Sequence, residues 1–200
     1  MNKLTLSLLI MALFTSTSNS ANTLNPFFTD YETPFQIPPF AEIKMEHYKP
    51  GFEQGMEEHL DEINDITENK EAATFENTIV ALERTGETLD KVSDVFFNLL
   101  SSNTNDQMDI LAQEISPKLS AHRDSILLNK DLYNRVKSVY DSRKSVNLNP
   151  EQTRLIEETH KYFVRAGIQL DEQSMKRLKE INQKLSSCLL YTSPSPRDRG

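Results

Sequence analysis

Apolar residues recur at steps of three or four along most of this chain, and this period constrains its fold more than any other feature. Phe52, Met56, Leu60, Ile63 and Ile66 form the first such stripe. Steps of three or four place side chains on one face of an α-helix, whereas a half-buried strand needs strict alternation. No stretch of the sequence alternates in that way, and no repeat of fixed period is found. The sequence therefore predicts an all-α fold.

Further stripes and capping residues predict the later helices. Thr74 is a good N-cap for a helix over residues 75–84 that ends at Gly86, and Asn149 before Pro150 starts a helix that ends at Gly167. The last helix begins near residue 171 and continues to residue 187. The expected inward residues are Leu89, Val92, Phe96 and Leu99; Leu111, Ile115, Leu119, His122 and Ile126; Leu132, Val136 and Val139; Leu155, Tyr162 and Phe163; and Met175, Leu178, Ile181 and Leu185.

Two prolines fall within these patterns. Pro50 is expected in the first turn of the first helix, where the missing N–H costs nothing. Pro117 stands in the middle of a stripe, and we expect it to kink or split that helix because it removes a backbone donor and crowds the preceding turn.

Residues 22–44 precede the helical region 45–187 and are rich in proline and aromatic residues, among them Phe27, Phe35 and Phe40. Proline disfavours regular structure, and exposed aromatic rings need a surface on which to lie. We expect an extended arm that wraps over the helices.

Residues 1–21 have the composition of a secretory signal peptide. Lys3 provides a positive start, residues 4–14 are apolar, and residues 15–21 are small and polar. We expect cleavage after Ser20 or Ala21, export to a bacterial periplasm, and no membrane span in the mature chain. An uncleaved anchor is the alternative, although the apolar stretch is short for one.

Residues 188–200 break the helical pattern and contain the only cysteine, Cys188. The string from Cys188 to Asp198 resembles, codon for codon, the translation of a transposon-based sequencing adaptor. We therefore expect residues 188–200 to be non-native and the chain to be a gene fragment cut at Ser187. A natural tail rich in proline and serine is the alternative. Without this segment the chain has no thiol chemistry.

Charge and motifs exclude several functions. The formal net charge is −8 and no basic stripe is present, so we expect no nucleic-acid partner. Acidic clusters such as Glu57-Glu58 and Asp61-Glu62 lack the spaced loop of a calcium site and read as a solvated helix face.

The four histidines are His47, His59, His122 and His160. None belongs to a His-Glu-x-x-His zinc motif. His122 lies in an apolar stripe and reads as a packed core residue with a satisfied hydrogen bond, whereas we expect His47 and His59 to be solvated. Glu157 with His160 is half of a di-iron motif, but that motif must occur twice. We therefore expect no catalytic, metal-binding or cofactor-binding residue in this chain.

Several strings resemble the opening of the peptidyl-dipeptidases of the thimet-oligopeptidase (M3) family of zinc peptidases. The similarity covers residues 25–187, and no catalytic residue lies in it. The matching strings occur in the same order in this chain as in the family. They are residues 25–27, 39–43, 47–56, 74–87, 95–99, 103–105 and 163–167.

This resemblance implies a larger, mainly helical enzyme with two lobes and a deep channel, whose wall these helices would help to form. It implies Zn²⁺ held by His-Glu-x-x-His and a later Glu, all beyond Ser187, and release of C-terminal dipeptides from short peptides. We expect this chain alone to be inactive and monomeric. The best-known bacterial member is cytosolic, which differs from the export signal here. A secreted all-α binding module without catalysis is the alternative, and the gene beyond Ser187 distinguishes the two.

Overall fold

The structure is a computed structural model that describes residues 25–192, with side chains through residue 187. The expected signal peptide, the first residues of the arm and most of the expected non-native tail lie outside the described residues. The described part is all α-helical and contains no strand, which confirms the predicted fold class. Its elements are η2 (Pro26–Phe28), η3 (Pro34–Gln36), α1 (Met45–Glu68), η4 (Phe75–Val80), α2 (Ala81–Glu83), α3 (Glu87–Ser102), α4 (Asp106–Leu127), α5 (Lys130–Ser142), α6 (Pro150–Arg165) and α7 (Glu172–Thr192).

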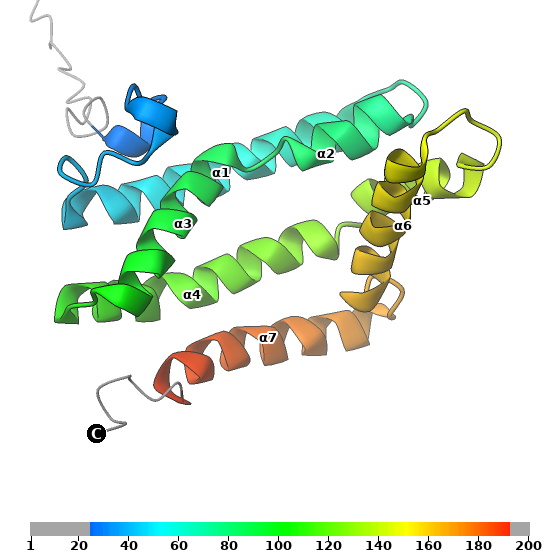
Figure 1. The fold of residues 1–200 in the computed structure, drawn as a ribbon. Coiled ribbons are helices and arrows are strands. Elements are labelled where there is room, and N and C mark those ends of the chain that lie inside the picture. Colours follow the sequence, from blue (N-terminus) through cyan, green and yellow to red (C-terminus); the bar gives the residue numbers. More distant parts are fainter. Residues whose placement is uncertain (1–24, 193–200) are drawn as a thin grey trace, which may run out of the picture.

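The helices form two long pairs joined at one end by a shorter pair (Figure 1). The α2–α3 segment runs back along α1, and α7 runs back along α4, while α5 and α6 pack together where the two long pairs meet. A side-chain hydrogen bond joins α7 to α4: the Asn182 amide on α7 donates to the buried Asp124 carboxylate on α4 at 2.9 Å. Among the described residues, no helix is long and apolar enough to cross a bilayer.

The first helix begins earlier than predicted. It starts at Met45, so Pro50 lies inside α1 and not in its first turn. The Nδ1 atom of His47 accepts a 3.0 Å hydrogen bond from the Lys44 backbone N–H at the helix start. Tyr48 is buried, and its ring packs on Phe27 and Phe96. We infer that this packing and the cap together stabilise the additional helical residues before Pro50, where the position of the proline had predicted that the helix would not yet have begun.

Of the two outcomes expected at Pro117, a split of the helix is wrong, and a kink stays a prediction. α4 is one helix from Asp106 to Leu127 with Pro117 inside it. Ile115 is fully buried before the proline, and Leu119 packs at the same core after it. Burial on both sides favours a continuous helix over a break that would expose one of these residues.

The predicted caps are found. Thr74 and Asn77 exchange hydrogen bonds at the start of η4, and Asn149 and Gln152 do so at the start of α6. Residues 75–80 are wound as a π-helix, however, and not as the expected α-helix. Gly86 and Gly167 end their segments in the left-handed region, with φ of 85° and 97°.

Two hydrophobic cores share α1 and α4. The aromatic core lies at the start of α1 and contains Phe27, Tyr48, Phe52, Leu89, Val92, Val95, Phe96, Met108, Leu111, Ala112 and Ile115. The aliphatic core lies toward the end of α1 and contains Ile63, Ile66, Ile79, Ile126, Leu127, Leu128, Leu132, Tyr133, Val136, Val139, Ile156, Phe163, Ile168 and Met175. Most predicted inward residues are in one of these cores. Among the exceptions, Tyr162, Ile181 and Leu185 are exposed, and Leu178 is half-buried outside both cores.

The arm contacts the helices mainly at its beginning. Phe27 is buried in the aromatic core, and the side-chain amide of Asn25 donates to the His47 backbone carbonyl at 2.9 Å. Phe35, in contrast, is 97% exposed and has a positive φ of 60°. The expectation that the aromatic residues of the arm lie against the helices therefore holds for Phe27 and is wrong for Phe35.

Candidate functional site

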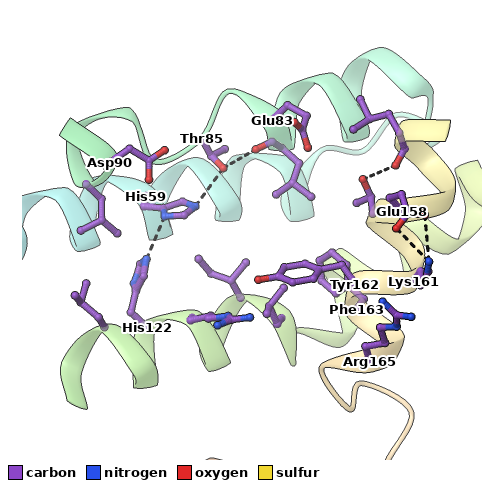
Figure 2. Close-up of a pocket in the computed structure, with 18 residues that line it drawn as sticks. His59, Glu83, Thr85, Asp90, His122, Glu158, Lys161, Tyr162, Phe163 and Arg165 are labelled. Atoms are coloured by element: carbon purple, nitrogen blue, oxygen red, sulfur yellow. Dashed lines mark hydrogen bonds and ion pairs between the residues drawn. The ribbon is translucent and has the colours of Figure 1, made fainter. Parts of the chain in front are cut away.

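A pocket lies between α1, α3, α4 and α6 (Figure 2). Its volume is about 590 Å³. This is within the range of about 300–1,000 Å³ that is common for small-molecule sites. Leu82, Leu89, Ile126, Leu155 and Phe163 give it apolar surface. Polar and charged residues from two opposite walls surround this surface.

A chain of hydrogen bonds crosses one end of the pocket and joins α1 to α4. The Nε2 atom of His122 lies 3.1 Å from Nδ1 of His59, and Nε2 of His59 lies 3.2 Å from the Thr85 hydroxyl (Figure 2). That hydroxyl also donates to the Leu82 backbone carbonyl at 2.8 Å.

The order of donors in this chain is fixed by the Thr85 hydroxyl. Its single proton goes to the carbonyl of Leu82, so the hydroxyl must accept from His59, whose Nε2 therefore carries the hydrogen. In a neutral ring, Nδ1 of His59 then has a free lone pair and accepts from the Nε2–H of His122. Nδ1 of His122 is left as a buried acceptor with no hydrogen-bond partner among the described residues.

Burial favours the neutral form of both rings. Burial and, to a smaller extent, the neighbouring His59 together lower the pKa of His122 to about 4. Burial also lowers the pKa of His59, although the carboxylates of Glu62 and Asp90 oppose this shift. Burial raises the pKa of Asp90, and Asp94 adds to this effect.

Close backbone packing holds His59 in place. A Cβ atom on Gly86 would lie 2.9 Å from Nδ1 of His59, so this position leaves no room for a side chain. The backbone N–H of Gly86 donates to the Glu62 carboxylate at 2.7 Å, which ties the turn between α2 and α3 to α1.

The opposite wall is basic. Arg123 on α4 lies with its guanidinium 5.5 Å from the ring centre of Tyr162, which is 48% exposed. Lys161 pairs with Glu158 at 3.2 Å, and Arg154 pairs with the same carboxylate at 2.7 Å. Arg165 lies at the end of α6 on this wall (Figure 2).

The histidine predictions are partly wrong. His47 and His59 are not solvated, because His47 caps α1 and His59 bridges Thr85 and His122. His122 is buried as predicted, but only one of its two ring nitrogens has a partner. His160 stacks on Tyr140 with ring centres 3.9 Å apart and bonds to the Tyr133 hydroxyl. No local motif identified the His59–His122 pair, since its members are 63 positions apart.

The described residues include no group of three or more His, Cys, Asp or Glu side chains placed to hold a metal ion. The histidine pair offers two facing nitrogens, but these bond to each other. The described part of the chain thus does not fit a zinc site, whereas the pocket has the size and polarity of a binding site.

No protein-family model matches the chain. Over 165 residues, which are 82% of the chain, it is 37% identical to "Dipeptidyl carboxypeptidase" of Escherichia coli and to that of Salmonella typhimurium. It is 27% identical over 150 residues to "Oligopeptidase A" of Haemophilus influenzae. The chain belongs to the thimet-oligopeptidase (M3) family of peptidases. It spans about a quarter of the length of its two dipeptidyl carboxypeptidase relatives, 24% in each case.

Membership of the M3 family confirms the resemblance inferred from the short strings around Tyr48 and Thr78. Both residues are buried, Tyr48 in the aromatic core and Thr78 within η4. In this chain, these strings therefore carry packing residues of the helical scaffold.

Proposed function

We propose that this chain is the N-terminal helical part of a zinc peptidase that releases dipeptides from the C-terminal end of peptides. The observation that carries this proposal is the difference in identity between two groups of relatives. Identity is 37% to the two proteins called dipeptidyl carboxypeptidase, but 23–27% to the bacterial proteins called oligopeptidase A. The higher identity favours the first activity over the second.

The zinc ligands and the catalytic base would lie in sequence beyond these residues. A zinc ion in such an enzyme polarises the scissile carbonyl and acidifies a bound water. The described residues do not fit a zinc site, so no step of this chemistry is assigned to them. Their proposed role is structural, because the two cores hold a rigid helical wall beside which short peptides would bind.

The complete gene tests this proposal. We expect the reading frame at this locus to continue past Ser187 and to encode a His-Glu-x-x-His motif. The purified product should release dipeptides from peptides with a free C-terminus, lose this activity with a chelator and regain it with zinc. An uninterrupted frame without the motif, or release of larger pieces only, would contradict the proposal. The first of these results would favour the alternative, a secreted binding module without catalysis.

We also propose export to the periplasm. The support is the arrangement of Lys3, the apolar residues 4–14 and the small residues 15–21. Cell fractionation followed by N-terminal sequencing should find a periplasmic protein that begins at Ala21 or Asn22. A cytoplasmic protein that retains Met1 would show that the segment is not a cleaved signal.

A further inference from the structure

The histidine pair, His59 and His122, joins α1 to α4 at one end of the pocket (Figure 2). The aromatic core lies on one side of the pair along both helices, and the aliphatic core lies on the other. The facing ring nitrogens are 3.1 Å apart, and the ring centres are 5.0 Å apart. The two helices therefore meet here through a polar contact that depends on where the ring hydrogens lie.

The number of hydrogens on the two rings decides whether this contact can form. In the neutral pair, one N–H faces one lone pair. After one added proton this arrangement is still possible, because the other hydrogens can occupy Nε2 of His59 and Nδ1 of His122. After a second added proton all four nitrogens carry hydrogen, so two N–H groups and two positive charges face each other.

The surroundings of the two rings favour a fixed order of proton uptake. Burial lowers the pKa of His59, but the carboxylates of Glu62 on α1 and Asp90 on α3 oppose this shift. Burial lowers the pKa of His122 to about 4, and His59 acts in the same direction. The first proton therefore favours His59, and the second must enter His122. Further charged residues around the pocket are Glu83 on α2, Arg123 on α4, and Glu158, Lys161 and Arg165 on α6, while α7 approaches α4 through Asn182, which bonds to Asp124.

Helix α4 has a natural place to bend beside the pair. Pro117 lies inside α4 and precedes His122 by a little more than one turn. Proline has no backbone N–H, so the helix lacks one hydrogen bond at this position, and helix bends concentrate at such residues. A bend here would move His122 away from His59 while Ile115 stays in the aromatic core.

We propose that the histidine pair is an acid-sensitive latch at this end of the pocket. With no more than one added proton, the pair holds α4 against α1. A second proton turns the contact into a repulsion, α4 bends at Pro117, and the pocket opens. The latch does not depend on the proposed peptidase activity, because its opening is measured without turnover.

Amide hydrogen exchange of the full chain, followed by mass spectrometry at pH 6.5, 5 and 4, tests the latch. Rates are expressed as protection relative to the unfolded chain. Between pH 6.5 and 4, the ratio of open to closed molecules should rise about eightyfold from protonation of His122 alone. Protection should fall accordingly in residues 59–63 and 117–126, and less in α5. Unchanged protection around the pair would overturn the proposal, as would an equal loss in α5, which would mean that the whole chain unfolds.

Glutamine variants show whether the pair is responsible. H122Q can still donate to His59 but cannot titrate, so it should keep its protection at pH 6.5 and lose most of the pH dependence. H59Q provides an independent test if H122Q does not fold. Its side-chain oxygen can accept from Nε2 of His122 in either protonation state, so its loss of protection should be several-fold smaller than in the parent chain.

H47Q is the matched control, because His47 accepts from the Lys44 N–H at the start of α1, away from the pair. It should behave like the parent chain. The latch is ruled out if H122Q or H59Q loses protection as steeply as the parent chain, or if H47Q removes the pH dependence as completely as H122Q.

Discussion

The aromatic and aliphatic cores use the same two helices in different ways. In the aromatic core, Phe96 is surrounded by rings that meet it edge-on, with centres 5.1 Å away for Tyr48 and 5.3 Å for Phe52. The aliphatic core contains mainly Ile, Leu and Val side chains and draws on η4, α5 and α6 as well as α1 and α4. One core thus depends on a few large rings, and the other on many smaller contacts.

A polar seam lies between the two cores. His59 follows the aromatic-core part of α1 and precedes Ile63, while His122 occupies the corresponding place on α4 between Ile115 and Ile126. At this point α1 and α4 are joined by hydrogen bonds instead of apolar packing. The comparison teaches that a single long helix pair can hold two separate cores when hydrogen bonds between histidine side chains replace apolar contact at their junction.

The largest change in stability is expected when the aromatic core loses the ring of Phe96. Phe96→Ala should lower the free energy of unfolding by about 3–5 kcal/mol, because a fully buried ring is replaced by a cavity. Urea unfolding followed by far-UV circular dichroism measures this loss. The control Phe35→Ala removes a ring that is 97% exposed and should change the value by less than about 0.5 kcal/mol. Similar losses in both variants would contradict the assignment of Phe96 to the core.

The seam should make stability depend on pH. The folded-state pKa of His122 is about 4, below its ordinary value of 6.5, so the unfolded chain takes up a proton first as the pH falls. The stabilisation is therefore complete above pH 6.5 and is lost as the pH falls toward 4. Its size is about 2–3 kcal/mol.

The variant His122→Gln isolates this effect. Its amide can still donate to Nδ1 of His59 but cannot titrate, so urea unfolding should become less dependent on pH between 6.5 and 4. The control His47→Gln retains an acceptor for the Lys44 N–H and leaves the seam intact. Stability of the H122Q variant that falls with pH as steeply as in the parent chain would mean that His122 is not the group that titrates.

Alanine variants of Gly55 and Gly51 test how closely α1 and α3 pack in the aromatic core. A Cβ on Gly55 would lie 2.9 Å from the Cα and N atoms of Leu89, whereas one on Gly51 would meet mainly the Val92 side chain. Backbone cannot rotate away, so Gly55→Ala should cost about 1–3 kcal/mol. Gly51→Ala should cost less, because moving the buried Val92 side chain disturbs less of the structure than moving the α3 backbone. Thermal unfolding of the two variants tests this order, and an equal cost would indicate that α3 moves as a unit.

The smallest effect concerns the start of α6, which borders the aliphatic core. The side-chain oxygen of Asn149 accepts from the Gln152 N–H at 2.8 Å. Asn149→Ala should lower stability by about 1 kcal/mol, whereas Asn149→Asp keeps an acceptor and should retain most of it. Chemical denaturation of both variants gives the comparison. If Asn149→Asp loses as much as Asn149→Ala, the hydrogen bond is not the source of stability.

Local sequence signals were sufficient where a helix is decided by its own residues. The stripes through Phe52 and Phe96 and the cap at Asn149 correctly predicted their helices, because periodicity and capping act within one or two turns. The cap at Thr74 correctly predicted where a helical segment begins, but not that its first six residues form a π-helix. The same local reasoning failed at Pro50 and in the expected split at Pro117, where burial of neighbouring residues outweighs the loss of a backbone donor.

The sequence by itself thus determined the all-α class and, through short ordered strings, membership of the M3 family. Only the tertiary structure decided which stripes share a core, why Tyr162 faces the pocket, and that His59 meets His122. The physical reason is the range of the interactions. A helix turn is set by residues three or four positions apart, whereas the histidine seam joins residues 63 positions apart whose meeting depends on how α1 and α4 pack.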